Sequence, residues 1–358
     1  QLHKRRKLRV FGVEGKLSNT YLNILSTLNG FMPRLPSLEG IVLVSSNSNF
    51  AITNPLPMLT LFERVRKITE YGWAHESLLE FILNNPSTMK KLEILRVTLF
   101  RMKYHNQDLS YLRNMEKLQS LRYLRIYPTV SAESLESFFQ NFTLPSSLEE
   151  INFEITTEYW GTIIEPKLIE TNNPFDTLPF FRHFLSQWEK LTKLKSLRFA
   201  STKHDRYYPN LLIIAILKRL KTLESFDLSS YDYTSSTDEP RKMDIGEMLN
   251  CIANTGARLS NFSAYAQNLN VDNLLPANAK KFQLETLFLT GSASSVKKLR
   301  LFFQMMQDSD RAMLTMFDCE IDNKEDLAFV IEEILLNNKK FVLDCNFKCK
   351  KIEKEDLL

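Results

Sequence analysis

The sequence predicts an α/β repeat fold, in which short parallel strands alternate with helices along one solenoid. Three observations predict it: an apolar motif recurs along the chain, its copies stand at similar spacings, and the segments between them carry apolar residues at helical spacing. Each repeat of such a fold buries its apolar side against its neighbours, so 358 residues can form one domain.

The clearest copy of the motif is Leu92–Val97, with apolar residues at its first, fourth and sixth positions. The fourth and sixth positions alternate as a half-buried strand requires. Other clear copies begin at Leu121, Leu148, Leu194, Leu223 and Leu284, and weaker ones at Leu8, Leu38, Val65, Leu259, Arg311 and Lys340. The pattern therefore indicates about 11–12 irregular repeats.

Helices are expected between the strands because most copies are separated by 25 to 30 residues, enough for a helix to return the chain. Right-handed crossovers then place the strands in a concave parallel sheet, with the helices on the convex side of a horseshoe. The predicted helices are Ser18–Leu28, Glu76–Leu83, Ala132–Phe142, Thr177–Trp188, Pro209–Leu220, Ile245–Ala253, Val296–Met306 and Lys324–Leu336.

Two longer spacings predict insertions, near 156–176 and 229–243, within a single domain spanning 1–358. The first contains Tyr159 and Trp160, so it is either a partner-contacting loop or a merely tolerated one. The second is rich in Ser, Thr and Asp and predicts a disordered loop open to phosphorylation. Because the chain opens on Gln1 rather than Met, we also expect a segment to precede it.

Charge, hydropathy and cysteine content narrow the class of protein. A formal net charge of +4 gives no global basic field for nucleic acid, although His3–Lys7 is either a nuclear-import or phosphate-contacting patch or a solvated end. The apolar run Leu211–Leu217 is far shorter than the ~20 residues that span a bilayer, so no membrane association is expected. Four unclustered cysteines predict an intracellular protein, cytoplasmic or nuclear, with reduced thiols.

Catalytic and metal-binding patterns are missing from the sequence. It contains no Gly-rich phosphate or dinucleotide motif, no His-Glu-x-x-His and no Gly-x-Ser-x-Gly. Cys345 and Cys349 come nearest to a metal pair, but a tetrahedral zinc site needs two more ligands. We therefore expect a protein that is not an enzyme and that uses no metal and no cofactor.

The candidate binding residues are those that point away from the core in each motif copy. Arg and Tyr, which most often anchor protein interfaces, are frequent among them. The predicted patch comprises Arg96, Tyr123, Arg125 and Tyr127, with Glu150 and Glu154 beside it, Arg198 further along, and the loop residues Tyr159 and Trp160. The alternative is a ladder of cross-strand pairs that stabilises the sheet and binds nothing.

The motif resembles the long leucine-rich repeats of the ribonuclease-inhibitor-like and cysteine-containing types. Leu314–Leu327 comes nearest the cysteine-containing form, with Cys319 after the strand and Ile321 two residues on. That form occurs in F-box proteins, so the resemblance implies a substrate receptor of a cullin-type ubiquitin ligase. The contact to the ligase adaptor would come from a segment upstream of the repeats.

Three functions remain open on the sequence alone. The first is recognition of a protein partner on the concave face, with the ligase receptor as a special case. The second is a structural subunit of a large assembly, held through its convex helices and its ends. The third is nucleic-acid binding through His3–Lys7 with Arg96, Arg125 and Arg198, which would show a steep salt dependence.

Overall fold

The structure is a computed structural model that forms two compact units, Gln1–Leu194 and Lys195–Leu358. It describes residues 8–15, 35–45, 56–72, 76–99, 109–128, 134–156, 178–202, 207–231, 243–265, 269–270, 273–290, 299–306 and 313–317, with single positions at 27, 30, 328, 329 and 332. The α/β class with parallel strands, predicted from the sequence, is confirmed within each unit. The single domain over 1–358 stays a prediction.

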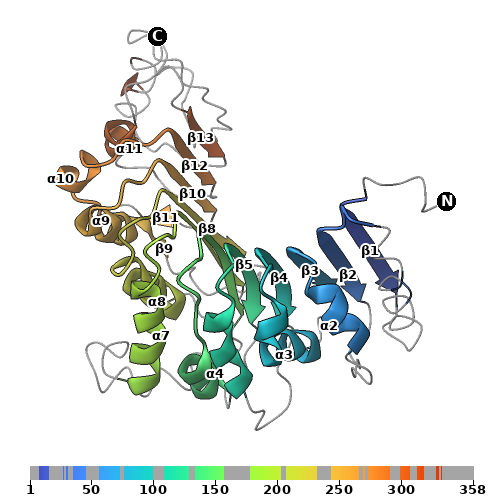
Figure 1. The fold of residues 1–358 in the computed structure, drawn as a ribbon. Coiled ribbons are helices and arrows are strands. Elements are labelled where there is room, and N and C mark those ends of the chain that lie inside the picture. The colour runs from blue at the N-terminus through green and yellow to red at the C-terminus, as the bar shows by residue number, and fades with distance from the viewer. Residues whose placement is uncertain are drawn as a thin grey trace. The chain divides into compact units, whose positions relative to one another are not determined.

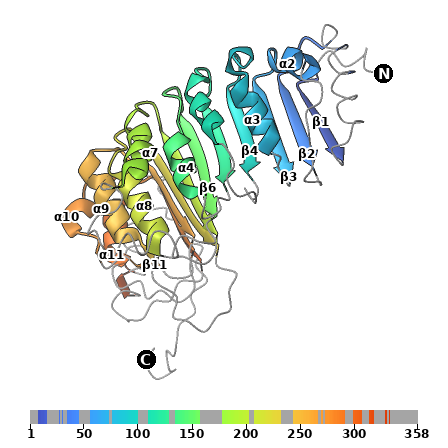
Figure 2. The same ribbon diagram turned by 90° about the horizontal axis from the view of Figure 1, so that it is seen from below.

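In the first unit, strands pair in chain order, and each runs parallel to the next (Figure 1). They are β1 (Val10–Gly15), β2 (Gly40–Ser45), β3 (Lys67–Gly72), β4 (Ile94–Leu99), β5 (Tyr123–Pro128) and β6 (Glu150–Thr156). The helices lie along one face of these strands (Figures 1 and 2). They are α2 (Leu56–Phe62), α3 (Glu76–Asn84), α4 (Leu135–Asn141) and α7 (Pro179–Glu189), with 3-10 helices η3 (Pro86–Thr88) and η4 (Ser110–Lys117).

The second unit repeats this plan. Its parallel strands are β7 (Ser196–Thr202), β8 (Ser225–Tyr231), β10 (Asn261–Tyr265), β12 (Thr286–Thr290) and β13 (Met313–Phe317). Its helices are α8 (Tyr207–Leu217), α9 (Ile245–Thr255), α10 (Pro276–Ala279) and α11 (Leu299–Met305). Two short strands, β9 (Met243–Asp244) and β11 (Leu269–Asn270), pair separately.

The strand register predicted by the motif is confirmed. Every motif copy from Leu8 to Arg311 is followed, two residues after its first position, by the start of a strand. Pairing also aligns equal motif positions, since Leu95 lies opposite Leu124, which lies opposite Ile151. All three are fully buried, so the apolar positions form continuous rows through the core. The copy at Lys340 lies outside the described residues.

Six of the predicted helices are confirmed, with ends that differ from the prediction by a few residues. They are the predictions from Glu76–Leu83 to Val296–Met306, and they correspond to α3, α4, α7, α8, α9 and α11. The sequence prediction missed α2, α10, the 3-10 helices and the β9–β11 pair. The helices predicted at Ser18–Leu28 and Lys324–Leu336, and both predicted insertions, fall largely outside the described residues.

Aromatic side chains fill the core where α4, β6 and α7 meet. Phe139 of α4 has its ring centroid 4.7 Å from that of Phe181 and 4.8 Å from that of Phe184. Phe153 of β6 meets Trp188 edge to face, with centroids 6.1 Å apart. All five side chains are almost fully buried, and burying a Phe contributes about 1.5–3 kcal/mol. This cluster fixes β6 against the helices behind it.

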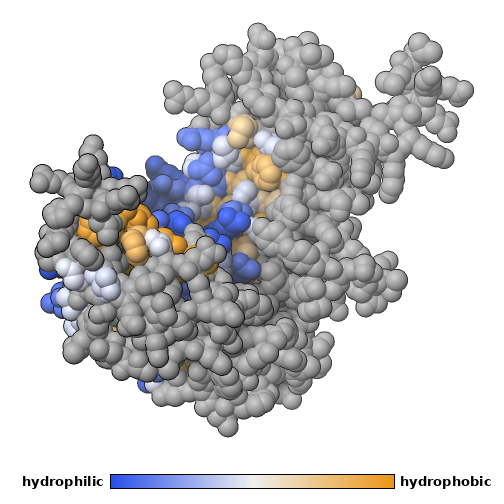
Figure 3. All heavy atoms as spheres, turned by 90° about the vertical axis from the view of Figure 1, so that its right-hand side faces the viewer, coloured by the Kyte–Doolittle hydropathy of each residue, from blue (hydrophilic) through white to orange (hydrophobic). Residues whose placement is uncertain are grey.

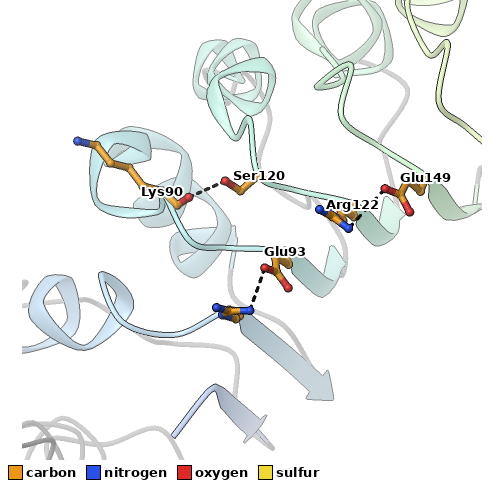
Figure 4. A network of polar contacts seen from close by, with 6 residues as sticks. Lys90, Glu93, Ser120, Arg122 and Glu149 are labelled. Carbon is orange, nitrogen blue, oxygen red and sulfur yellow. Dashed lines mark hydrogen bonds and ion pairs between the residues drawn. The ribbon is translucent and has the colours of Figure 1, made fainter. Parts of the chain in front are cut away.

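Charged residues of alternating sign stand just before the strands of the first unit. We call the series Arg9, Glu39, Arg66, Glu93, Arg122 and Glu149 the charge ladder. In each ladder residue except the last, Glu149, the backbone carbonyl accepts hydrogen bonds from two backbone N–H groups of the next repeat, at 2.7–3.0 Å. Side chains pair at Arg66–Glu93, 3.4 Å, and at Arg122–Glu149, 3.7 Å (Figure 4).

Serine side chains add hydrogen bonds near the amino ends of the strands. The Ser120 hydroxyl donates to the Lys90 backbone carbonyl at 2.6 Å (Figure 4). The Ser147 hydroxyl donates to the Leu121 carbonyl at 2.6 Å in the following repeat. Backbone and side-chain bonds thus tie consecutive repeats together at the amino ends of the strands.

Candidate partner-binding face

The candidate site lies on the outward positions of β3 to β6, which alternate with the buried positions. In β5, Tyr123, Arg125 and Tyr127 are half-buried, whereas Leu124 and Ile126 are buried. Because inward side chains pack toward the helices, the outward ones occupy the opposite face of the strands. We call this set the outward face; its members are Thr69, Ile94, Arg96, Tyr123, Arg125, Tyr127, Glu150, Asn152 and Glu154.

The surface of the described residues combines polar and apolar patches. Seen from the right-hand side of Figure 1, hydrophilic side chains lie beside hydrophobic ones (Figure 3). The outward face has the same mixture, because Ile94 and the two tyrosines stand among charged residues. Such a surface suits a partner that offers both apolar and polar groups.

Two arginines of this face stack on tyrosine rings. The guanidinium carbon of Arg96 lies 4.7 Å from the centroid of Tyr123, on the neighbouring strand. That of Arg125 lies 4.5 Å from the centroid of Tyr127, two residues along the same strand. Each contact contributes roughly 0.5–1 kcal/mol at an exposed site and holds the guanidinium plane in one orientation. The structure thus brings together the four predicted residues Arg96, Tyr123, Arg125 and Tyr127.

Four polar side chains stand side by side across β3 to β6, and we call them the polar row. Pairing places Thr69 opposite Arg96, Arg96 opposite Arg125, and Arg125 opposite Asn152. Each has a buried atom without a hydrogen-bond partner in the structure: Thr69 Oγ1, Arg96 Nε, Arg125 Nε and Asn152 Oδ1. Thr69 is 1% exposed and Asn152 is 6% exposed, so both ends of the row are shielded from water.

Glu150 lies at the edge of the outward face, opposite Tyr123. Glu150 is exposed overall, but partial burial of its carboxyl raises the pKa of that group, and the Arg96 guanidinium offsets part of the rise. The charge of Arg96 therefore reaches across one strand to β6. Glu154 is half-buried on the same strand.

The remaining predicted residues lie elsewhere. Arg198 belongs to β7 in the second unit, where its Nε lies 3.4 Å from Asp227 Oδ2 on the neighbouring strand. Its charge is thus balanced within the unit. Tyr159 and Trp160 lie outside the described residues.

The predicted patch lacks two members of the polar row, Asn152 and Thr69, and Thr69 belongs to a motif copy that the sequence shows only weakly. The motif copy at Val65 has Glu70 in place of an apolar sixth residue, so it appeared degenerate. Its fifth position nevertheless aligns with the fifth position of the next copies, Arg96 and Arg125. Aligning all copies by their first residue would have found it.

The described part of the chain has neither a cluster of metal ligands nor a membrane-spanning helix. No group of three or more His, Cys, Asp or Glu side chains there could hold a metal ion. Among the same residues, no helix has the length and apolar character needed to cross a bilayer.

Comparison with known proteins gives no identification: no protein-family model matches the chain, and no curated protein matches it.

Proposed function

We propose that this chain is a leucine-rich repeat protein whose first unit recognises a protein partner on its outward face. The observation that carries the proposal is the pair of stacked Arg–Tyr contacts, Arg96 on Tyr123 and Arg125 on Tyr127. Arg and Tyr are enriched among the residues that dominate binding energy, and their stacking lowers the entropy lost on binding.

The assignment to leucine-rich repeats rests on the regularity of the motif. Strands begin at a constant offset from the motif, and equal motif positions pair across neighbouring strands. A solenoid of such repeats would present its outward positions as a continuous binding surface. The narrower role of an F-box-type substrate receptor would require an additional segment that contacts a cullin adaptor.

Protein recognition is preferred over nucleic-acid binding because of the charges on the face. Glu150 and Glu154 border the arginines, and Arg198 is paired with Asp227. A polyanion would be repelled by the two carboxylates, whereas a protein partner can match a surface of mixed sign.

The test is an affinity purification of the full chain, with mass spectrometry of the co-purifying proteins. Three proteins are compared: the wild type, Arg125→Glu, and Arg64→Glu, a matched charge reversal at an exposed position after α2. We expect a stoichiometric partner with the wild type and with Arg64→Glu, and its loss with Arg125→Glu. One large complex recovered equally with all three proteins would instead make the chain a structural subunit held through other surfaces.

A further inference from the structure

The polar row is the least satisfied part of the described structure. Native proteins provide hydrogen-bond partners for the great majority of their buried polar atoms. Here four such atoms without partners, from Thr69, Arg96, Arg125 and Asn152, stand at consecutive positions of one register row. The alignment of these atoms indicates a site that is completed by another molecule.

The second unit provides an internal comparison at the same motif position. Its equivalent row begins with Arg198 and Asp227, which form an ion pair across β7 and β8. Next to that row, Asn261 and Thr286 are joined by a hydrogen bond between their side chains. In the second unit, the acidic residue on the neighbouring strand thus provides the arginine with a partner. In the first unit, the neighbouring strand carries a second arginine at that position, Arg125 opposite Arg96.

The chemistry of the row specifies what it lacks. Arg96 and Arg125 occupy paired positions on neighbouring strands, whose backbones lie about 4.8 Å apart, so both long side chains can reach the two oxygens of one carboxylate. Arginine presents its Nε and Nη donors as a planar fork that matches this geometry. The side-chain oxygen of Asn152, Oδ1, can accept a hydrogen bond from a backbone N–H group. An extended peptide provides such a group beside its acidic residue.

Glu150 distinguishes a carboxylate from a phosphate. The Arg96 guanidinium offsets part of the rise in the pKa of its carboxyl, so the charges of Glu150 and Arg96 interact. With Glu150 ionised, Arg96, Arg125 and Glu150 carry one net positive charge, which a singly charged carboxylate neutralises and a phosphate with nearly two negative charges exceeds. The row therefore favours an Asp or Glu side chain over a phosphorylated residue.

We propose that the polar row binds an extended acidic segment of the partner protein, with one Asp or Glu side chain bridging Arg96 and Arg125. This rests on the proposed function, because it names the chemistry of the partner on the same face. Binding gives each buried Nε an acceptor, while the tyrosine rings hold the guanidinium planes in place.

The experiment is a selection of random twelve-residue displayed peptides on the full chain. It is repeated with Arg96→Met/Arg125→Met and with Arg198→Met, a matched arginine removal in the second unit. The wild type and Arg198→Met should enrich peptides that share one Asp or Glu position, and Arg96→Met/Arg125→Met should not. The strongest peptide is then resynthesised with Glu, Gln or phosphoserine at that position. The Gln form should bind roughly tenfold more weakly or worse, because a charge-assisted pair is lost.

Two controls separate binding from folding. Thermal unfolding of Arg96→Met/Arg125→Met should stay close to wild type, since the change removes unsatisfied donors along with the stacking. Arg125→Lys keeps the charge but loses the planar fork, so it should also weaken the Glu peptide.

Several results would overturn the inference. Enrichment by the wild type of peptides that need Arg125 but share no Asp or Glu position would support the proposed function and contradict the acidic segment. If the phosphoserine peptide binds more tightly than the Glu peptide, the polar row recognises a phosphate and the proposed carboxylate is wrong. Peptides that bind all variants equally would contradict both proposals, and no enrichment with the wild type would contradict the acidic segment.

Discussion

At the scale of single residues, Arg96 and Arg125 combine one satisfied interaction with one unsatisfied one. Stacking on Tyr123 and Tyr127 engages the face of each guanidinium, while its Nε remains buried without an acceptor. A buried donor without a partner costs about 1–3 kcal/mol, which is more than an exposed cation–π contact contributes. The two arginines are thus better suited to binding than to stabilising the unit.

Glu150 provides a prediction of pH dependence at this scale. Its raised pKa means that the folded protein binds the proton more tightly than the unfolded chain does. Stability therefore falls as pH rises above the ordinary value of 4.5, toward the folded pKa. Glu150→Gln should remove this loss, so its melting temperature relative to wild type should increase between about pH 4.5 and pH 7. A difference that shrinks as pH rises would show that the Glu150 carboxylate is stabilised in the folded protein.

Gly256 provides a second prediction. It follows the last residue of α9 with φ of +77°, a left-handed conformation that suits glycine. Gly256→Ala should lower the free energy of unfolding by about 1 kcal/mol, measured by denaturant titration. Gly30→Ala is the control, because an added Cβ there meets no atom within 4 Å and φ is not left-handed. An equal loss at both positions would point to a general cost of adding a methyl group.

At the scale of elements, each strand is held by two kinds of contact. Apolar rows bury the fourth and sixth motif positions, and the charge ladder joins the residues just before the strands. The first kind contributes most of the stability, because exposed ion pairs contribute roughly 0–1 kcal/mol. The ladder mainly favours the correct neighbour for each strand.

The aromatic cluster gives the larger of two predictions for elements. Phe139→Ala would leave a cavity between α4 and α7, where two other Phe rings lie within 5 Å. It should cost about 3–5 kcal/mol in the free energy of unfolding. Phe139→Leu, which fills most of the space, should cost clearly less. Equal losses for the two variants would mean that ring-to-ring contact matters more than volume.

The charge ladder gives the smaller prediction. Arg66→Glu would place three acidic positions in succession, between Glu39 and Glu93. Because these side chains are largely exposed, the loss should be about 1 kcal/mol or less, and should shrink in 1 M NaCl. Arg64→Glu is the control for net charge. A loss that is insensitive to salt would mean that Arg66 acts through packing.

At the scale of the whole molecule, the two units share a repeating plan but differ in their outward rows. The strands could be predicted from the sequence because successive side chains of a strand point to opposite faces. The motif shows this alternation, and its apolar residues, such as Leu95 and Val97, are buried. It also predicted Arg96, Tyr123, Arg125 and Tyr127 as neighbours, since register follows from the motif.

Other features depended on contacts that sequence spacing does not contain. The stacking of Arg96 on a tyrosine of the next strand depends on side-chain rotamers. The ion pair of Arg198 with Asp227 likewise depends on side-chain rotamers, because motif spacing places the two residues on neighbouring strands without fixing the contact between their side chains. The helix α2 was missed because Leu56–Phe62 is too short and too uniformly apolar to show a helical period.

The most direct measurement of the central claim is site-specific photo-crosslinking to the co-purified partner. A photoreactive phenylalanine analogue replaces either Tyr127, on the outward face, or Gln140, exposed on helix α4. Binding on the outward face predicts a crosslinked partner from position 127 and none from position 140. A crosslink from position 140 alone would show that the partner is held by the helices, and would contradict the account.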